Sequence, residues 1–193
     1  MLNQFQDSLA QIAIQTQSHL SQLVFVTSIL WISFLLNQVL GNWLFRFGIF
    51  PRHIRGLPGV FFAPFIHADF NHLFFNTIPF IVLANFIMIQ GVSLFYNISI
   101  FIIIVSGLIT WVIGKRGIHI GASGLITGYW AYLLADGFQN PSLTTVIVAL
   151  IVVYYFAGIF FGLFPSKKGV SWEGHLSGAI AGVLVVVLQN ITL

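Results

Sequence analysis

One serine stands between glycines, in Gly121-Ala122-Ser123-Gly124, directly before an apolar segment. A later apolar segment carries a histidine, His175, near its start. A serine hydroxyl is a weak nucleophile at neutral pH, and a neutral imidazole can take its proton and later deliver it to a leaving group. Amide N–H groups at the start of a helix lack partners and favour developing negative charge. Ser123 and His175 therefore predict nucleophilic serine chemistry, provided that their helices pack together.

Glycines at intervals of four could bring these two helices together. They lie in both apolar segments, at Gly124, Gly128, Gly174, Gly178 and Gly182. Small residues at this spacing let helix backbones approach closely in lipid. A single stripe of this kind is more often packing alone, but here each stripe carries a reactive residue in its first turn. We therefore expect the serine and the histidine to come within hydrogen-bond reach.

A third polar group stands at the start of another apolar segment: His67, Asp69, Asn71, His72 and Asn76. His72 and Asn76 are four apart and share a helix face, and both side chains can donate hydrogen bonds to an oxyanion. Polar side chains in a membrane span are costly and face a cavity or a partner. For Asp69 and Asn71 we prefer a structural role in helix capping and interhelical bonding. For His67 we weigh such a structural role and a role in the site equally.

The sequence lacks the residue patterns that other hydrolytic chemistries require. It has no cysteine, which excludes disulfides, thiolate metal sites and a cysteine nucleophile. His67 and His72 are five apart, not the four that aligns two zinc ligands on one helix. The four acidic residues form no intramembrane aspartyl pair: Asp7, Asp69, Asp136 and Glu173. Glu173 is expected to cap or orient the last helix, and His119 is a possible pocket residue, although a loop histidine is more often structural.

The composition indicates a membrane protein. Hydrophobic residues make up 58% of the 193 residues, charged residues 6%, and the mean hydropathy is +0.99. A soluble domain carries about a quarter charged residues. We therefore expect a multi-pass integral membrane protein, and the lack of a repeated alternating pattern favours helices over a barrel. The seven basic residues are too few and too scattered for a nucleic-acid surface, so no nucleic-acid partner is expected.

The predicted fold class is an all-α membrane protein with six spans. We expect the spans near residues 20–40, 67–90, 93–113, 123–137, 142–164 and 174–193. They form a single domain, 19–193, after a Gln-rich segment, 1–18, that is expected to be an interfacial helix rather than a cleavable signal. The loop 41–66 mixes glycines and prolines with aromatics, which is typical of the membrane interface. The fourth span, at about 22 Å, is shorter than the roughly 30 Å hydrocarbon core, so one of its ends must be recessed.

Together these features closely resemble the rhomboid family of intramembrane serine proteases, over about residue 45 to the end. The resemblance rests on the six-span layout and on four stretches: Gly48-Ile49-Phe50-Pro51-Arg52, the His67…His72…Asn76 set, Gly121-Ala122-Ser123-Gly124, and Trp172-Glu173-Gly174-His175. It implies a catalytic dyad without an essential acid, in which Ser123 is the nucleophile and His175 the general base.

The resemblance also implies the supporting groups and the partners. The Ser123 N–H with the His72 and Asn76 side chains would bind the oxyanion, supported by Gly121 and a structural His67. The implied substrates are transmembrane segments of other proteins in a lipid bilayer, as in a bacterial-type plasma membrane, with no metal or organic cofactor. The sequence carries no signal of the oligomeric state.

Two departures bear on the shape of the pocket. Some family members have an aromatic residue four positions after the serine that packs on the catalytic histidine, and here that position is Thr127. Tyr129 and Trp130 are the candidates to replace it. Pro58-Gly59 stands where some bacterial members have a Trp-Arg pair before the first histidine.

Both the orientation of the protein in the membrane and its function have an alternative interpretation. All seven basic residues fall in loops on the side of Ser123, which the positive-inside rule assigns to the cytoplasm, whereas the resemblance implies that this side faces outward. A non-catalytic rhomboid-like factor that binds or escorts membrane proteins is the alternative function, although such a factor needs neither Ser123 nor His175. A small transporter with a broken fourth helix is a weaker one.

Overall fold

The computed structural model describes residues 2–164 and 171–191, and these residues form helices and loops without a β-strand. The helices, with 3-10 turns marked η, are α1 Leu2–Ser18, α2 Leu20–Val39, η1 Trp43–Phe47, η2 Ile54–Gly56, α3 Gly59–Phe62, η3 Ala63–Phe65, α4 Phe70–Gln90, α5 Val92–Ile113, α6 Ser123–Gln139, α7 Leu143–Phe156, α8 Gly158–Phe161 and α9 Trp172–Ile191. The protein is therefore all-helical in its described part, as the sequence predicts.

Among the described residues, four helices are long and apolar enough to cross a membrane: α2, α4, α5 and α9. The expectation of a helical membrane protein is thereby confirmed in its general form. Helix α6 has 17 residues and α7 has 14. At 1.5 Å per residue they rise only about 25 and 21 Å, less than the roughly 30 Å hydrocarbon core. The predicted count of six spans is therefore not confirmed, because α6 and α7 are shorter than the hydrocarbon core.

The predicted helix boundaries lie within three residues of the observed ones except in the fifth segment, and the predicted end at 193 lies outside the described residues. Helix α6 begins at Ser123 as expected, and α9 begins two residues before the predicted start at 174. The fifth segment, predicted as continuous over 142–164, instead ends at Phe156 and is followed by the short helix α8. Gly158 and Gly162 lie in this part of the chain, and glycine is a poor helix former, which accounts for the early end.

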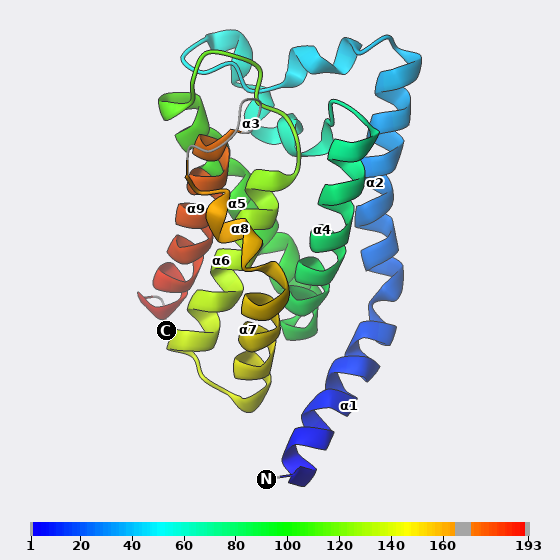
Figure 1. The fold of residues 1–193 in the computed structure, drawn as a ribbon, viewed down its shortest axis with the longest axis vertical. Coiled ribbons are helices and arrows are strands. Elements are labelled where there is room, and N and C mark those ends of the chain that lie inside the picture. Colours follow the sequence, from blue (N-terminus) through cyan, green and yellow to red (C-terminus); the bar gives the residue numbers. More distant parts are fainter. Residues whose placement is uncertain (1, 165–170, 192–193) are drawn as a thin grey trace.

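Helix α6 lies at the centre of the bundle. It contacts α4, α5, α7 and, most extensively, α9, as Figure 1 shows in part. A Cβ atom on Gly178 would overlap the carbonyl oxygen of Gly124, and one on Gly182 would overlap that of Gly128. The close approach that the two glycine stripes predict is therefore confirmed.

Two loops on one end of the bundle hold each other in place (top of Figure 1). Ile49 and His119 form an isolated antiparallel bridge, with N–O distances of 2.9 Å in both directions. Farther along, Gly121 N–H donates to the carbonyl of Ala63 at 2.9 Å. The loop 41–66 thus fixes the loop 114–122, which leads into Ser123 at the start of α6.

Residues 2–18 are helical, and polar side chains tie the end of this helix to the bundle. Helix α1 continues almost directly into α2 and contacts α4 and α7. Asn85 of α4 donates to the hydroxyl of Thr16 at 3.0 Å and lies 2.9 Å from His19 Nε2. The placement of α1 in the membrane interface stays a prediction.

We predict that Gly178→Ala destabilises the protein by about 1–3 kcal/mol or more, because an added methyl group forces α9 away from α6. Gly158→Ala is the matched control, since a Cβ there meets no atom within 4 Å. Thermal unfolding in detergent measures the difference. Equal melting temperatures for the two variants would contradict the tight contact.

Candidate active site

One cavity of about 530 Å³ joins the residues that the sequence singles out. Its lining comes from the chain before α4, from α4, from the loop 114–122 and from the starts of α6 and α9: Ala68, Asp69, His72, Asn76, Ile118, His119, Ile120, Ser123, Ser171 and His175. The serine, the late histidine and the two predicted oxyanion donors therefore face a common space.

Ser123 is the first residue of α6, and its partly buried side chain lines the cavity. The N–H groups in the first turn of a helix have no acceptor within that helix. The carbonyl of Ser123 accepts a hydrogen bond from the Thr127 hydroxyl at 2.7 Å. In the described part of the chain, the Ser123 hydroxyl itself has no hydrogen-bond partner, so it is available to a molecule in the cavity.

His175 lies in the first turn of α9, and its ring is oriented by a backbone group. Its Nδ1 is 2.9 Å from the carbonyl oxygen of Gly162. A carbonyl can only accept, so Nδ1 carries the proton and Nε2 keeps a free lone pair. This is the tautomer that a general base needs.

The expected hydrogen bond between Ser123 and His175 is absent from the described residues. This part of the prediction is wrong, although both residues line the same cavity. The approach of the two first turns is limited by backbone, because even a Cβ atom on Gly124 would lie 3.1 Å from the carbonyl oxygen of Gly174. Catalytic hydrogen bonds are often long in enzymes without substrate.

His72 and Asn76 lie on one face of α4, beside the turn before Ser123. Asp69 caps this helix, since its Oδ1 accepts from the His72 N–H at 2.9 Å, as its capping interpretation predicts. Asn76 Nδ2 is buried and has no hydrogen-bond partner among the described residues. Such an orphaned donor on a cavity wall is costly unless a ligand or water meets it. It is therefore placed to donate to a group in the cavity.

Gly121 leaves room for these two side chains. Its φ of +110° is strained for any residue with a side chain. A Cβ atom there would also lie 2.5 Å from His72 Nε2 and 3.7 Å from Asn76 Nδ2. A glycine is thus required at this position for both conformation and space.

His67 is fully buried behind the cavity and supports its wall. Its Nε2 accepts a hydrogen bond from the Ala122 N–H at 3.3 Å, and its ring lies edge-on to His72 with centroids 5.1 Å apart. Burial, helped by the nearby His72, lowers the pKa of His67 from 6.5 to about 4. The ring is therefore neutral at physiological pH and can accept, which fits the structural role expected of it.

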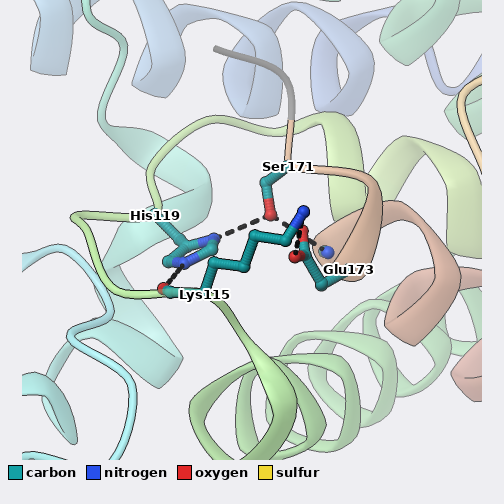
Figure 2. A network of polar contacts seen from close by, with 5 residues as sticks. Lys115, His119, Ser171 and Glu173 are labelled. Carbon is teal, nitrogen blue, oxygen red and sulfur yellow. Dashed lines mark hydrogen bonds and ion pairs between the residues drawn. The ribbon is translucent and has the colours of Figure 1, made fainter. Parts of the chain in front are cut away.

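A second polar network ties the loop 114–122 to the start of α9 (Figure 2). His119 Nδ1 is 2.7 Å from the Ser171 hydroxyl, whose oxygen also accepts from the Gly174 N–H at 3.2 Å. His119 Nε2 is 2.8 Å from the carbonyl oxygen of Lys115, and Lys115 Nζ lies 3.5 Å from Glu173 Oε1. Glu173 thus links the start of α9 to the loop 114–122, and its role in capping or orienting the helix stays a prediction.

Sequence reasoning missed Ser171 as part of this site. The one local signal was a serine directly before an apolar helix, a frequent N-cap position. His119, in contrast, is confirmed as a cavity residue. No three His, Asp or Glu side chains gather as metal ligands within the described ranges.

The residues considered as replacements for an aromatic partner of His175 do not stack on it. The ring of Tyr129 packs against Phe80 and Phe95, with centroids 6.1 and 5.8 Å away, and its hydroxyl bonds Ser99 at 2.6 Å. Over residues 2–164 and 171–191, no aromatic ring stacks on His175. The carbonyl of Gly162 instead bonds the edge of the imidazole at Nδ1.

We predict that the protein loses stability as the pH falls from 6.5 to 4, with a contribution from His67 of about 3 kcal/mol. The pKa of His67 is about 4 when folded and 6.5 in the unfolded chain, so the unfolded state binds more protons in this window. Chemical unfolding in detergent at several pH values measures the slope. His67→Gln should flatten it, and equal slopes for both proteins would refute the assignment.

Comparisons with known proteins show the family of this chain. A model of the Rhomboid domain matches residues 55–190. The chain is 42% identical over 172 residues to uncharacterized protein Rv1337 of Mycobacterium tuberculosis (strain ATCC 25618 / H37Rv), covering 84% of this chain and 72% of the relative. It is 37% identical over 173 residues to uncharacterized protein ML1171 of Mycobacterium leprae (strain TN), covering 84% and 68%. A protein of Acanthamoeba polyphaga mimivirus whose name includes the words "rhomboid protein" is 31% identical over 129 residues, covering 64% and 70%. Because the family match spans well over half of the chain, the protein belongs to the rhomboid family.

Proposed function

We propose that this protein is an intramembrane serine endopeptidase that cleaves transmembrane segments of other membrane proteins. Ser123 is its nucleophile and His175 its general base. The observation that carries the proposal is the single cavity lined by Ser123, His175, His72 and Asn76. Family membership supports the same reaction class.

In the first step, the Ser123 Oγ attacks the carbonyl carbon of the scissile peptide bond. The hydroxyl proton passes to His175 Nε2, which is free because Nδ1 bonds the Gly162 carbonyl. A positioned base of this kind contributes roughly 100- to 10,000-fold to the rate. The imidazolium that forms keeps its Nδ1–H bond to the carbonyl.

Attack places a negative charge on the former carbonyl oxygen. We assign three donors to this oxygen: the N–H of Ser123, the amide of Asn76 and the imidazole of His72, all from residues that line the cavity. Asn76 Nδ2 has no competing partner in the described part of the chain, so its hydrogen bond is formed only with the substrate. Donors fixed in this way stabilise the transition state without reorganising.

The tetrahedral intermediate then collapses, and the bond between carbon and nitrogen breaks. His175 delivers its proton to the leaving amine, and the acyl group stays on Ser123 Oγ. A water molecule from the cavity gives a proton to His175 and attacks the ester. The second product leaves as a carboxylic acid, and the serine hydroxyl is restored.

The geometry of the cavity favours an unwound substrate. An α-helix with its side chains is roughly 10–12 Å wide and its peptide carbonyls are already hydrogen-bonded. A cavity of about 530 Å³ admits an extended stretch of a few residues instead. We therefore propose cleavage near the membrane face, where a helix unwinds at least cost.

We also propose six membrane crossings in a bacterial plasma membrane. Helices α6 and α7 are the two short crossings. Each of them runs in the direction opposite to the helix that precedes it in the chain. The closely similar relatives are mycobacterial. Fractionation of a host cell tests the location: recovery in the soluble fraction would contradict it.

We predict that Ser123→Ala and His175→Ala each abolish cleavage of a membrane-anchored reporter while the protein still accumulates. The reason is that each change removes a group that makes or breaks a bond. The measurement is product formation by purified protein in liposomes. Continued cleavage of the reporter by the Ser123→Ala protein would refute the proposal.

A non-catalytic binding or escort factor is the second candidate. The observation in its favour is the lack of a hydrogen bond between Ser123 and His175 in the described structure. A fluorophosphonate probe separates the two functions, because it reacts with an activated serine and not with an ordinary hydroxyl. Absence of labelling in the folded protein, together with stable client binding, would favour the escort role.

We predict that Asn76→Ala lowers kcat by roughly 100-fold with little change in KM, because one oxyanion donor is lost. Asn71→Ala is the matched control on the same helix, since Asn71 is exposed and does not line the cavity. Its kcat should stay within about twofold of the parent protein. Similar losses in both variants would argue against a donor role for Asn76.

A further inference from the structure

We propose that the backbone carbonyl of Gly162 is the third member of the catalytic unit. It holds His175 in the base tautomer and stabilises the imidazolium, a role that a carboxylate fills in serine–histidine–aspartate enzymes. Gly162 is thus a positioning residue that acts through its main chain. The inference rests on the proposed function and adds to it the group that orients the base.

The acidic side chains of this chain are all engaged elsewhere or distant. Asp69 caps α4 through the His72 N–H, and Glu173 pairs with Lys115. Asp136, toward the other end of α6, accepts from Gln90 and Asn140 (both at 3.0 Å), and Asp7 lies in α1. These four are the complete set of acids in the sequence. In the described part of the chain, no acidic side chain bonds His175, whose Nδ1 meets the Gly162 carbonyl instead.

The carbonyl of Gly162 is well placed to replace a carboxylate. It lies 2.9 Å from His175 Nδ1, the usual length of an N–H···O bond. The N–H of the same peptide unit, that of Leu163, donates to the carbonyl of Phe160 at 3.1 Å, which fixes this peptide after α8. The imidazole thus bonds a backbone group whose own position is restrained.

The absence of a side chain at Gly162 is explained by the imidazole rather than by the backbone. Its φ of −70° and ψ of −14° are open to every residue. A Cβ atom would lie 2.8 Å from His175 Nδ1 and 3.3 Å from its Cε1, too close for van der Waals contact. Gly158, four residues earlier, would meet no atom within 4 Å. Only the second glycine is needed to admit the ring.

The imidazole is held here without an aromatic partner among the described residues. Thr127, at the position four after the serine, is buried and bonded to its own helix. Tyr129 packs toward α4 and α5. In the described residues the imidazole is held from the α8 side, by main chain, instead of from α6 by a ring. The base is therefore positioned by a different element than in relatives that carry the aromatic residue.

The test compares Gly162→Ala with Gly158→Ala in the full-length protein. Nitrogen-15 NMR of labelled histidines, with His175 identified by the signal lost in His175→Ala, reports which ring nitrogen carries the proton. Parent protein and Gly158→Ala should show Nδ1–H, and Gly162→Ala should show a mixture of tautomers. In Gly162→Ala kcat should fall roughly 10- to 100-fold with KM changed less than about twofold.

Several outcomes would overturn the inference. An Nε2–H tautomer in the parent protein does so by itself, even if Gly162→Ala fails to fold. Parent-like tautomer and kcat in a folded Gly162→Ala do so as well. The proposed function fails separately: if the parent shows Nδ1–H that Gly162→Ala loses, yet the parent cleaves no reporter, the contact stands and the protease assignment falls.

Discussion

The close approach of α6 to α9 is the contact on which the rest of the site depends. One helix begins with Ser123, and the other carries His175 in its first turn. In lipid, packing rather than the hydrophobic effect holds helices together, so close contact requires small residues. At Gly178 and Gly182 the two backbones leave no room for a methyl group. The separation of the two reactive side chains is therefore set by backbone contact.

The second requirement is a polar, irregular segment at depth in the molecule. Backbone outside a helix is tolerated there only when protein or cavity water meets its polar groups. The turn before α6 satisfies this rule with partners far along the chain: Gly121 N–H bonds Ala63, and Ala122 N–H bonds His67. The long aromatic loop 41–66 thus has a positioning role in addition to any contact with lipid. It fixes the turn from which Ser123 projects.

The parts of this structure that could be predicted have local sequence signals. Glycine spacing predicted the contact of α6 with α9, and the polar start of α4 predicted its Asp69 cap. The missed features depend on tertiary structure. A backbone carbonyl such as that of Gly162 carries no side-chain signature, and the pairing of Ser171 with His119 joins residues 52 positions apart. The early end of α7 reflects the low helix propensity of glycine, and a pattern of apolar residues does not reveal that effect.

The carbonyl that holds His175 has a consequence for how this protein tolerates mutation. A carboxylate partner is lost by a single side-chain substitution, whereas a carbonyl is supplied by every amino acid. What must be preserved at position 162 is therefore the lack of a side chain, a property shared by no other residue type. Because the partner of His175 is a backbone carbonyl, an alignment of related sequences shows no polar residue that marks it. Under the proposed function, a rhomboid can thus look like a simple dyad in sequence while its base is oriented by a third group.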